Sequence, residues 1–374
     1  MSDNTDFFEE CTSASEVKQF IVEKYFTIWA SIMVNYLKGR GLPLRLAYID
    51  LFAGQGKYDD GTESTPILVV KKILANPTFY NNIMLYFNDM NAEYIGKLKV
   101  NLSLIPDIEK LRYKPVFENY TVDKEVVEMF NRSKLPPSLL FIDPCGYDGF
   151  SLGLVWSVVK GFGCDCIAFF NYSRINMHLS NRAIPREKLD AILECDSQKL
   201  LLELSGLNPI ERERKVIDIV KSGALAKGIN YTMEFRFKSI TNRTSHFLLF
   251  FSRSFKGYDE MKQVMYKASV YKDDDGVADY QFAYGKLDEQ LTISFESFTT
   301  LSDLKRSLLH EYKGKTIEFE ALYEEHSVGK RYIIQNYKKV LREMLVQKII
   351  STNRTPKSGF SLDLVITFPK DRNE

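Results

Sequence analysis

Cysteine and histidine are scarce in this sequence, and neither forms a metal-binding pattern. The 374 residues include 5 cysteines without a C-x-x-C pair and 4 histidines without an H-x-x-x-H pair. An odd number of cysteines with this spacing argues against a zinc site and against a disulfide framework. We therefore expect a protein of the reducing cytoplasm that binds no metal.

An excess of one charge sign and a long apolar run are also missing. Lysine and arginine number 50 against 49 aspartates and glutamates, so the formal net charge is +1. This balance excludes a uniformly basic nucleic-acid coat, although a local basic patch is compatible with it. No apolar run reaches the ~18 residues of a membrane-spanning helix, and residues 1–10 lack a signal-peptide core. The sequence therefore predicts no membrane contact.

What the sequence does contain is an alternation of apolar, strand-length runs with helical stretches. An amphipathic helix is expected over 14–38, and the later runs are apolar on both faces, as in a parallel sheet covered by helices. Residues 173–230 are polar and helical, and 231–240 with 245–252 predict an antiparallel hairpin. The expected parallel strands are 44–52, 83–88, 112–117, 138–143 and 164–172.

Five parallel units that end in a hairpin are typical of class I S-adenosylmethionine-dependent methyltransferases. We therefore predict an α/β fold with their Rossmann-like, seven-stranded sheet. From about residue 301 the pattern changes to three amphipathic helices and two strand runs, which predict a winged helix-turn-helix. The expected domains are a methyltransferase-like domain over 1–269 with a helical insert over 173–230, a linker over 270–299 and a winged-helix domain over 300–374.

The first expected strand runs into D-L-F-A-G-Q-G, residues 50–56. Glycines at 54 and 56 permit a tight turn and a close approach of a ligand to the backbone, and Asp50 supplies a carboxylate for the amino-acid part of a cofactor. The third glycine of the nicotinamide fingerprint is replaced by Asp59, and the spacing of a phosphate-binding P-loop is absent. We expect S-adenosylmethionine to bind Asp50, Phe52, Ala53, Gly54 and Gly56.

Polar residues also follow the next two strands. Asp89, after the second strand, is placed to accept hydrogen bonds from ribose hydroxyls, although a helix N-cap is the alternative. Asn119, after the third strand, is placed to reach the adenine ring. Both residues are therefore expected to complete the cofactor site.

The fourth strand ends in F-I-D-P-C-G-Y, residues 141–147, where the reacting centre of such a fold should lie. We expect Asp143 to polarise an amino group, Pro144 to fix the turn and Tyr147 to stack on a base. Amino-methyltransferases have D-P-P-Y or N-P-P-Y here, and Tyr147 stands one position late. One alternative is that this segment is only a turn in a fold that has lost its reaction. Another is that Cys145 is a nucleophile, although a small packed thiol is the favoured role for Cys145.

The segments YIDLFAGQGKYDDG, FIDPCGY and SHFLLFFSRSFKGYDEMKQVM, together with Lys18 and Tyr25, resemble the three-Cys-motif partner protein family (TcmP) over roughly residues 14–350. The resemblance implies a methyltransferase-like fold. It also implies a partner protein whose cysteine triplet suggests an iron–sulfur radical enzyme. The residues that match the family's two motifs are Asp50, Gly54 and Gly56 in the nucleotide loop, with Gln55 in place of the usual proline, and Asp143, Pro144 and Gly146 after the fourth strand.

Basic residues concentrate near the C-terminus of this otherwise neutral chain. A basic third helix followed by a basic wing suits phosphates and a nucleic-acid groove, DNA or RNA, whereas docking of a protein partner is the alternative. The expected nucleic-acid contacts are Lys330, Arg331, Lys338, Lys339, Arg342, Arg354 and Lys357.

Together these features predict methyl transfer to nucleic acid, with a base nitrogen as the favoured acceptor. A base in a duplex would have to be flipped out first. Arg174, Arg182 and Arg186 of the insert would then select the target. The alternative function is a non-catalytic adaptor that binds nucleic acid or a radical-enzyme-like partner.

Overall fold

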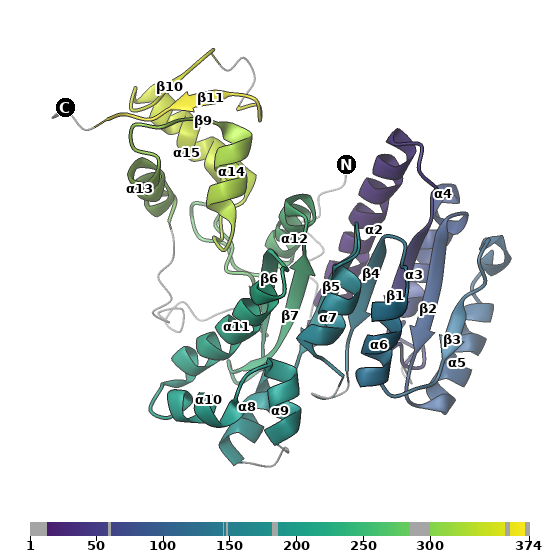
Figure 1. The fold of residues 1–374 in the computed structure, drawn as a ribbon. Coiled ribbons are helices and arrows are strands. Elements are labelled where there is room, and N and C mark those ends of the chain that lie inside the picture. The colour runs from purple at the N-terminus through teal and green to yellow at the C-terminus, as the bar shows by residue number, and fades with distance from the viewer. Residues whose placement is uncertain are drawn as a thin grey trace. The chain divides into compact units, whose positions relative to one another are not determined.

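The computed structural model describes residues 13–58, 61–144, 146, 149–181, 186–284, 300–355 and 360–370 (Figure 1). The chain divides into two compact units. The first comprises Met1–Val264 with Phe282–Tyr284, and the second comprises Met265–Gln281 with Gly285–Glu374. None of the described helices combines the length and apolar character needed to cross a membrane.

The first unit is built on an eight-stranded sheet with the order β3-β2-β1-β4-β5-β7-β6-β8. Strands β1 to β5 pair in parallel, whereas β7 runs antiparallel to β5 and β6. The strand order reverses between β1 and β4, which creates a switch point at their carboxyl ends. The strands are β1 (Leu46–Asp50), β2 (Ile83–Asn88), β3 (Val116–Glu118), β4 (Ser138–Ile142), β5 (Asp165–Phe170), β6 (Tyr231–Lys238), β7 (Thr244–Ser252) and β8 (Gln281–Phe282).

This order is that of the class I methyltransferase sheet, as the sequence predicts, with one correction. The sheet has eight strands rather than seven, because the two-residue β8 adds to the edge beside β6. The sequence places these residues in a linker and allows one strand between 270 and 285 without locating it, since two residues are too few to show a period-2 pattern.

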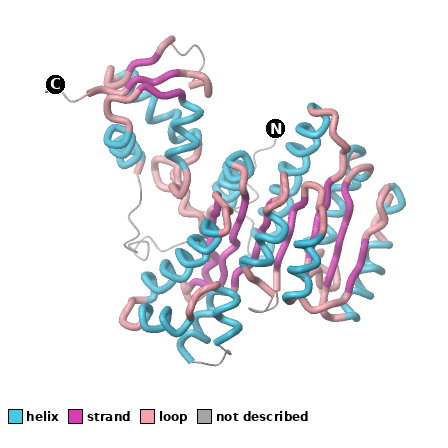
Figure 2. The backbone as a smooth tube through the Cα atoms, viewed as in Figure 1, coloured by secondary structure: helices cyan, strands magenta, loops and turns pink. Residues whose placement is uncertain are grey.

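Helices cover both faces of the sheet (Figure 2), which is why β1 and β4 are buried along their whole length. Helix α2 begins at a capping box in which Ser13 and Glu16 exchange hydrogen bonds, and it buries Val17, Ile21 and Tyr25. The helices are α2 (Ala14–Gly39), α3 (Thr65–Leu74), α4 (Pro77–Tyr80), α5 (Ala92–Ser103), η1 (Ile108–Lys110), α6 (Lys124–Arg132), α7 (Leu152–Val159), α8 (Tyr172–Asn181), α9 (Arg186–Leu193), α10 (Ser197–Leu204), α11 (Pro209–Ala226) and α12 (Phe255–Ala268).

The second unit contains the winged helix that the sequence predicts. Its helices are α13 (Leu301–Glu311), α14 (Phe319–Ser327) and α15 (Ile334–Val346). Its sheet has the order β10-β11-β9, formed by Ser351–Thr352, Val365–Thr367 and Thr316–Glu318. The sequence assigns Ile317 to a helix, but its backbone pairs with Ile366 of β11. A strand of three residues is too short for its pattern to compete with the helical pattern that follows.

Candidate active site

A cleft of about 670 Å³ opens at the carboxyl ends of β1, β2 and β4. Ligands of open α/β sheets bind at this edge, beside the point where the strand order reverses. Several predicted residues that are distant in sequence line the cleft together. They are Asp50, Phe52, Ala53, Gly54, Gly56, Asp89, Asp143 and Pro144, and Arg174 of α8 joins them.

The loop after β1 has the backbone that its glycines predict. Gly54 has φ +61° and Gly56 has φ +87°, a left-handed conformation that other residues rarely adopt. A Cβ on Gly56 would also lie 2.9 Å from Leu98 Cδ1 of α5. Asn101 holds the loop to the same helix by donating from Nδ2 to the carbonyl of Gln55 at 2.8 Å. The loop therefore presents its backbone to the cleft in a fixed shape.

Asp50 is fully buried at the floor of this loop. Its Oδ1 accepts a hydrogen bond from Phe52 N at 3.1 Å, and its Oδ2 accepts one from the Tyr48 hydroxyl at 3.4 Å. Burial outweighs these bonds and raises the pKa of Asp50 from its ordinary 3.8 to about 8. At neutral pH the carboxyl is therefore largely protonated, and an approaching cation would favour its ionisation.

Asp89 joins two turns at the end of β2. Its Oδ2 accepts from Gly54 N at 3.0 Å, and its Oδ1 accepts from Asn91 N at 2.9 Å. The N-cap of α5 is Asn91, not Asp89. Asp89 thus fixes the glycine loop while it lines the cleft, and its contact with ribose stays a prediction.

Asn119 lies at the end of β3 and is exposed. Its Nδ2 donates to the Asp89 carbonyl at 2.7 Å. The structure does not place Asn119 among the residues that line the cleft. Its predicted contact with adenine is untested, and the described contact braces the ends of β2 and β3.

Asp143, just after β4, pairs with a lysine that the sequence does not link to it. Lys18 of α2 lies with Nζ 2.5 Å from Asp143 Oδ2, and its side chain is only 13% exposed. The same ammonium lies 4.8 Å from the centre of the Phe169 ring. Of the neighbouring predicted residues, Pro144 lines the cleft, whereas Tyr147 and Cys145 lie outside the described residues.

His246 of β7 reaches the same corner, and the sequence treats it as an ordinary side chain. Its ring lies 5.3 Å from the Phe169 ring, centre to centre. Burial lowers the pKa of His246, although the charge of Asp143 acts in the opposite direction. For Lys18, burial works to lower the pKa, but the charge and hydrogen bond of Asp143 leave it raised. At neutral pH the corner therefore holds the Lys18 ammonium, paired with Asp143, and a neutral imidazole.

The helical insert contributes Arg174 to the cleft. This arginine follows β5 on the exposed side of α8. Arg182 and the side chain of Arg186 lie outside what the structure describes. The predicted target-selecting role of the insert therefore stays a prediction, supported at one position by the location of Arg174.

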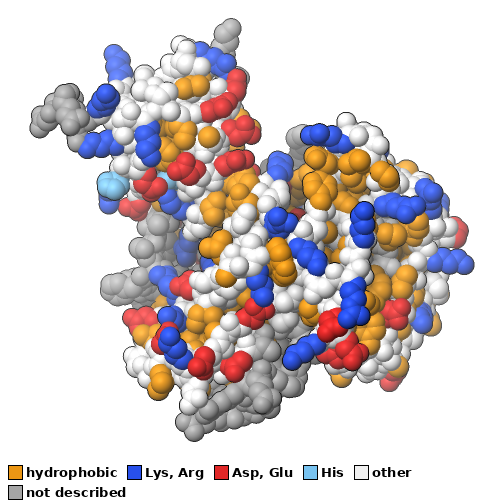
Figure 3. Space-filling view, in the orientation of Figure 1, with side chains coloured by type: hydrophobic (Ala, Val, Ile, Leu, Met, Phe, Trp, Pro, Cys, Tyr) orange, Lys and Arg blue, Asp and Glu red, His pale blue; other side chains and the backbone are white. Residues whose placement is uncertain are grey.

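In the second unit, several of the predicted basic contacts have acidic partners. Lys339 lies 3.4 Å from Asp275, and Arg354 contacts Asp363. Among the described residues, Lys338 and Arg342 of α15 make no ion pair, and Lys357 is outside the description. Figure 3 shows acidic side chains gathered on the side of this unit where α14 lies.

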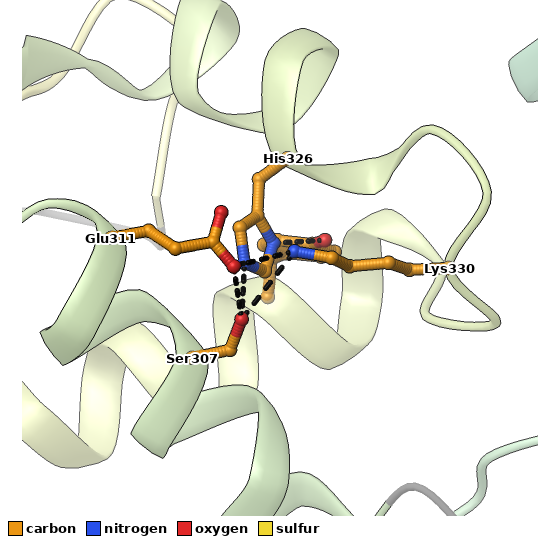
Figure 4. A network of polar contacts seen from close by, with 5 residues as sticks. Ser307, Glu311, His326 and Lys330 are labelled. Atoms are coloured by element: carbon orange, nitrogen blue, oxygen red, sulfur yellow. Dashed lines mark hydrogen bonds and ion pairs between the residues drawn. The ribbon is translucent and has the colours of Figure 1, made fainter.

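Lys330 belongs to a polar network between α13 and the loop after α14 (Figure 4). Its Nζ lies 3.0 Å from Glu311 Oε1 and 3.4 Å from Ser307 Oγ. His326 joins Ser307 Oγ through Nε2 at 2.9 Å and the Tyr337 hydroxyl through Nδ1 at 2.7 Å. Burial opposes ionisation of Glu311, but the hydrogen bonds of Ser307 and Lys330 prevail and lower its pKa to about 2. Lys330 is thus engaged inside the module.

Comparison with known proteins is informative mainly for the second unit. Residues 284–357 match the family described as the GMT-like wHTH domain. A search of curated proteins finds no match to this chain.

Solved structures similar to this chain include methyltransferases and a protein of Legionella pneumophila. The latter, LPL1258, is 14% identical, with 63% of this chain and 85% of that chain covered and a TM-score of 0.31. The glycopeptide N-methyltransferase MtfA, complexed with sinefungin, is 10% identical over 60% and 86% of the two chains, with a TM-score of 0.31. The O-methyltransferase TomG of Streptomyces achromogenes, in complex with SAM, is 9% identical over 67% and 96%, with a TM-score of 0.32. At such TM-scores these likenesses carry no conclusion about a substrate.

Proposed function

We propose that this chain is an S-adenosylmethionine-dependent methyltransferase that acts on a nucleic acid held by the winged helix. The observation that carries the proposal is the cleft at the switch point of the sheet. There the glycine loop after β1, Asp89 after β2 and Asp143 after β4 come together in one cavity.

The residues of the cleft fit S-adenosylmethionine. Asp50, whose pKa is raised to about 8, is a carboxyl that ionises when an ammonium group approaches. The backbone of Gly54 and Gly56 leaves room for the cofactor, and Met90, Tyr94 and Phe141 offer apolar surface for a flat ring. When bound, the cofactor supplies an electrophilic methyl group on a sulfonium.

Asp143 lies at the border of this cleft and of the corner occupied by Lys18 and His246. The sequence favours a base nitrogen as the acceptor, which requires Asp143 to receive amino hydrogens. The ion pair with Lys18 offsets the negative charge of Asp143, the group that would receive those amino hydrogens.

The winged helix supports a nucleic-acid substrate through α15, which carries Lys338 and Arg342 without ion-pair partners among the described residues. Winged helices place such a helix in a groove and use basic residues on phosphates. The match of residues 284–357 to a wHTH domain family agrees with this assignment. A protein with a cysteine triplet remains a proposed partner on the strength of sequence resemblance.

The test combines cofactor binding with nucleic-acid binding on the full chain. Calorimetry with S-adenosylmethionine should give micromolar binding to the wild type and none to Asp50→Asn, which keeps the shape of the side chain but cannot ionise. Asp218→Asn, at an exposed position of α11, is the matched control and should bind as the wild type does.

Lys338→Gln combined with Arg342→Gln should weaken binding of a DNA or RNA oligonucleotide while cofactor binding is unchanged. Absence of cofactor binding by the wild type, with nucleic-acid binding retained, would replace the enzyme by the adaptor alternative.

A further inference from the structure

Three side chains that are distant in sequence form a cluster with the ring of Phe169, in which Lys18 and His246 lie against the ring and Asp143 pairs with Lys18. Lys18 comes from α2, Asp143 from the end of β4 and His246 from β7. The ammonium lies 2.5 Å from the carboxylate and 4.8 Å from the centre of the Phe169 ring. The imidazole lies 5.3 Å from the same ring. Asp143 also lines the cleft, so it links the cleft to the cluster.

The charge of this cluster is unsuited to an amine acceptor. A neutral amino nitrogen becomes cationic as it takes up a methyl group, and an unpaired carboxylate would stabilise that charge. Here the carboxylate is already paired with the Lys18 ammonium. A second positive charge beside Asp143 would meet repulsion from Lys18 and little attraction from a neutralised pair.

A hydroxyl acceptor has the opposite requirement, because its oxygen becomes more negative as its proton leaves. The neutral pair gives that oxygen little net charge stabilisation, but the Lys18 ammonium has three N–H donors and Asp143 accepts one of them. A further N–H therefore remains to donate to the oxygen, and a neutral imidazole accepts the proton. The lowered pKa of His246 and the raised pKa of Lys18 keep both groups in the required states at neutral pH. Asp143 holds Lys18 in place.

We propose that Lys18, Asp143 and His246 form the acceptor site and that the acceptor is the 2′-hydroxyl of RNA. This inference rests on the proposed function. The hydroxyl oxygen forms the new bond to the methyl carbon as the carbon–sulfur bond breaks, the electron pair of that bond stays on sulfur, and the hydroxyl proton goes to His246. RNA is the nucleic acid with a hydroxyl at every nucleotide, because DNA lacks the 2′ oxygen.

A purely structural role for the Lys18–Asp143 pair, anchoring α2 to the sheet, would leave the acceptor chemistry untouched. Two variants separate the roles. Lys18→Met keeps the unbranched, flexible side chain, one atom shorter, but removes the charge, and His246→Gln removes the base. The matched controls are Lys24→Met on the same helix and His310→Gln at an exposed position of α13.

Transfer of a tritiated methyl group is measured to random-sequence RNA and to DNA of the same length, followed by digestion to nucleosides and mass spectrometry. We expect 2′-O-methyl ribonucleosides from RNA and no transfer to DNA. Lys18→Met and His246→Gln should each lower the rate of methyl transfer by about 100-fold or more, without a change in the Kd for S-adenosylmethionine. The control variants should transfer methyl groups at the wild-type rate.

An independent readout needs no turnover. Proton NMR of the four histidine rings, with the His246 signal assigned from its absence in His246→Gln, gives the pKa of His246. The groups that act on this pKa are Asp143, which raises it, and Lys18, which lowers it. Lys18→Met should therefore raise the pKa of His246, and Lys24→Met should leave it in place.

Methylated bases, transfer to DNA, full activity of His246→Gln, or cofactor binding without any transfer to RNA would each overturn the acceptor assignment and leave the cofactor site standing. Absence of cofactor binding by the wild type would instead overturn the proposed function itself.

Discussion

Asp50→Asn is expected to stabilise the first unit and to abolish cofactor binding at the same time. The carboxyl is fully buried, and burial raises its pKa from 3.8 to about 8. At any pH at which the Asp50 carboxyl is ionised in the unfolded chain, folding therefore requires this carboxyl to take up a proton. An asparagine resembles the protonated carboxyl in shape and carries no such requirement.

The magnitude follows from linkage. Because the pKa in the folded state is the higher one, the stability that Asp50 permits is complete below about pH 4 and is lost as the pH rises toward 8. One proton costs about 1.4 kcal/mol per pH unit, so the penalty at pH 7 is about 4 kcal/mol. Between pH 5 and pH 7 the advantage of Asp50→Asn over the wild type should grow by about 3 kcal/mol.

Urea unfolding followed by tryptophan fluorescence measures this difference. The protein has 2 tryptophans, Trp29 and Trp156, and both lie in the first unit, so the signal reports on that unit alone. Hydrogen bonds of the new amide add an offset that does not vary with pH, and the change with pH is therefore the diagnostic quantity. Asp218→Asn should show no such change. A constant difference between wild type and Asp50→Asn from pH 5 to pH 7 would refute the buried, protonated carboxyl.

Two further predictions concern the same cleft. Cofactor binding at pH 7 should release roughly 0.9 proton, since a group with a pKa of about 8 is that fraction protonated before it meets the ammonium. Calorimetry of the wild type in buffers of different ionisation enthalpy measures this release, and a binding heat that is the same in all buffers would contradict it. Gly56→Ala should lower the free energy of unfolding by about 1–3 kcal/mol and weaken cofactor binding. Gly61→Ala is its control, because Gly61 has nearly the same φ, +86°, but no atom within 4 Å of an added Cβ. Equal losses in the two variants would show that the contact with Leu98 is unimportant.

The sequence predicts the parallel strands well because each is a continuous apolar run bounded by turn residues. It misplaces the third strand, expected at 112–117 and found as Val116–Glu118. That strand lies at the sheet edge, and Val116 is 45% exposed, so its sequence does not need the continuous apolar run of a buried strand. Strand β9 is missed and β8 is not located within the linker that allows one strand, because runs of two and three residues are too short to show a pattern.

The glycine loop is predictable because its residues are adjacent and their backbone requirement is local. The pair formed by Lys18 and Asp143 joins positions 125 residues apart, and no local spacing encodes such a contact. Asp89 shows a third case, in which the position is predicted but its bond to Gly54 N is not. The sequence therefore locates the side chains at the carboxyl ends of the strands. The partners that set the charge of these side chains are brought to them only by the fold.

Charge counting has the same limitation in the winged helix. Lys339 and Arg354 sit in pairs whose members are 42–62% exposed, and such surface pairs contribute only about 0–1 kcal/mol, so phosphates can compete for these cations. Lys330 differs, because Glu311, Ser307 and His326 hold it within a network that also supports the contact between α13 and α14. Releasing Lys330 to a phosphate would leave Glu311, whose pKa is lowered to about 2, ionised without its cation. Phosphate contacts should therefore fall on Lys338 and Arg342 first and on Lys339 and Arg354 second. Lys330 should act by keeping the module folded.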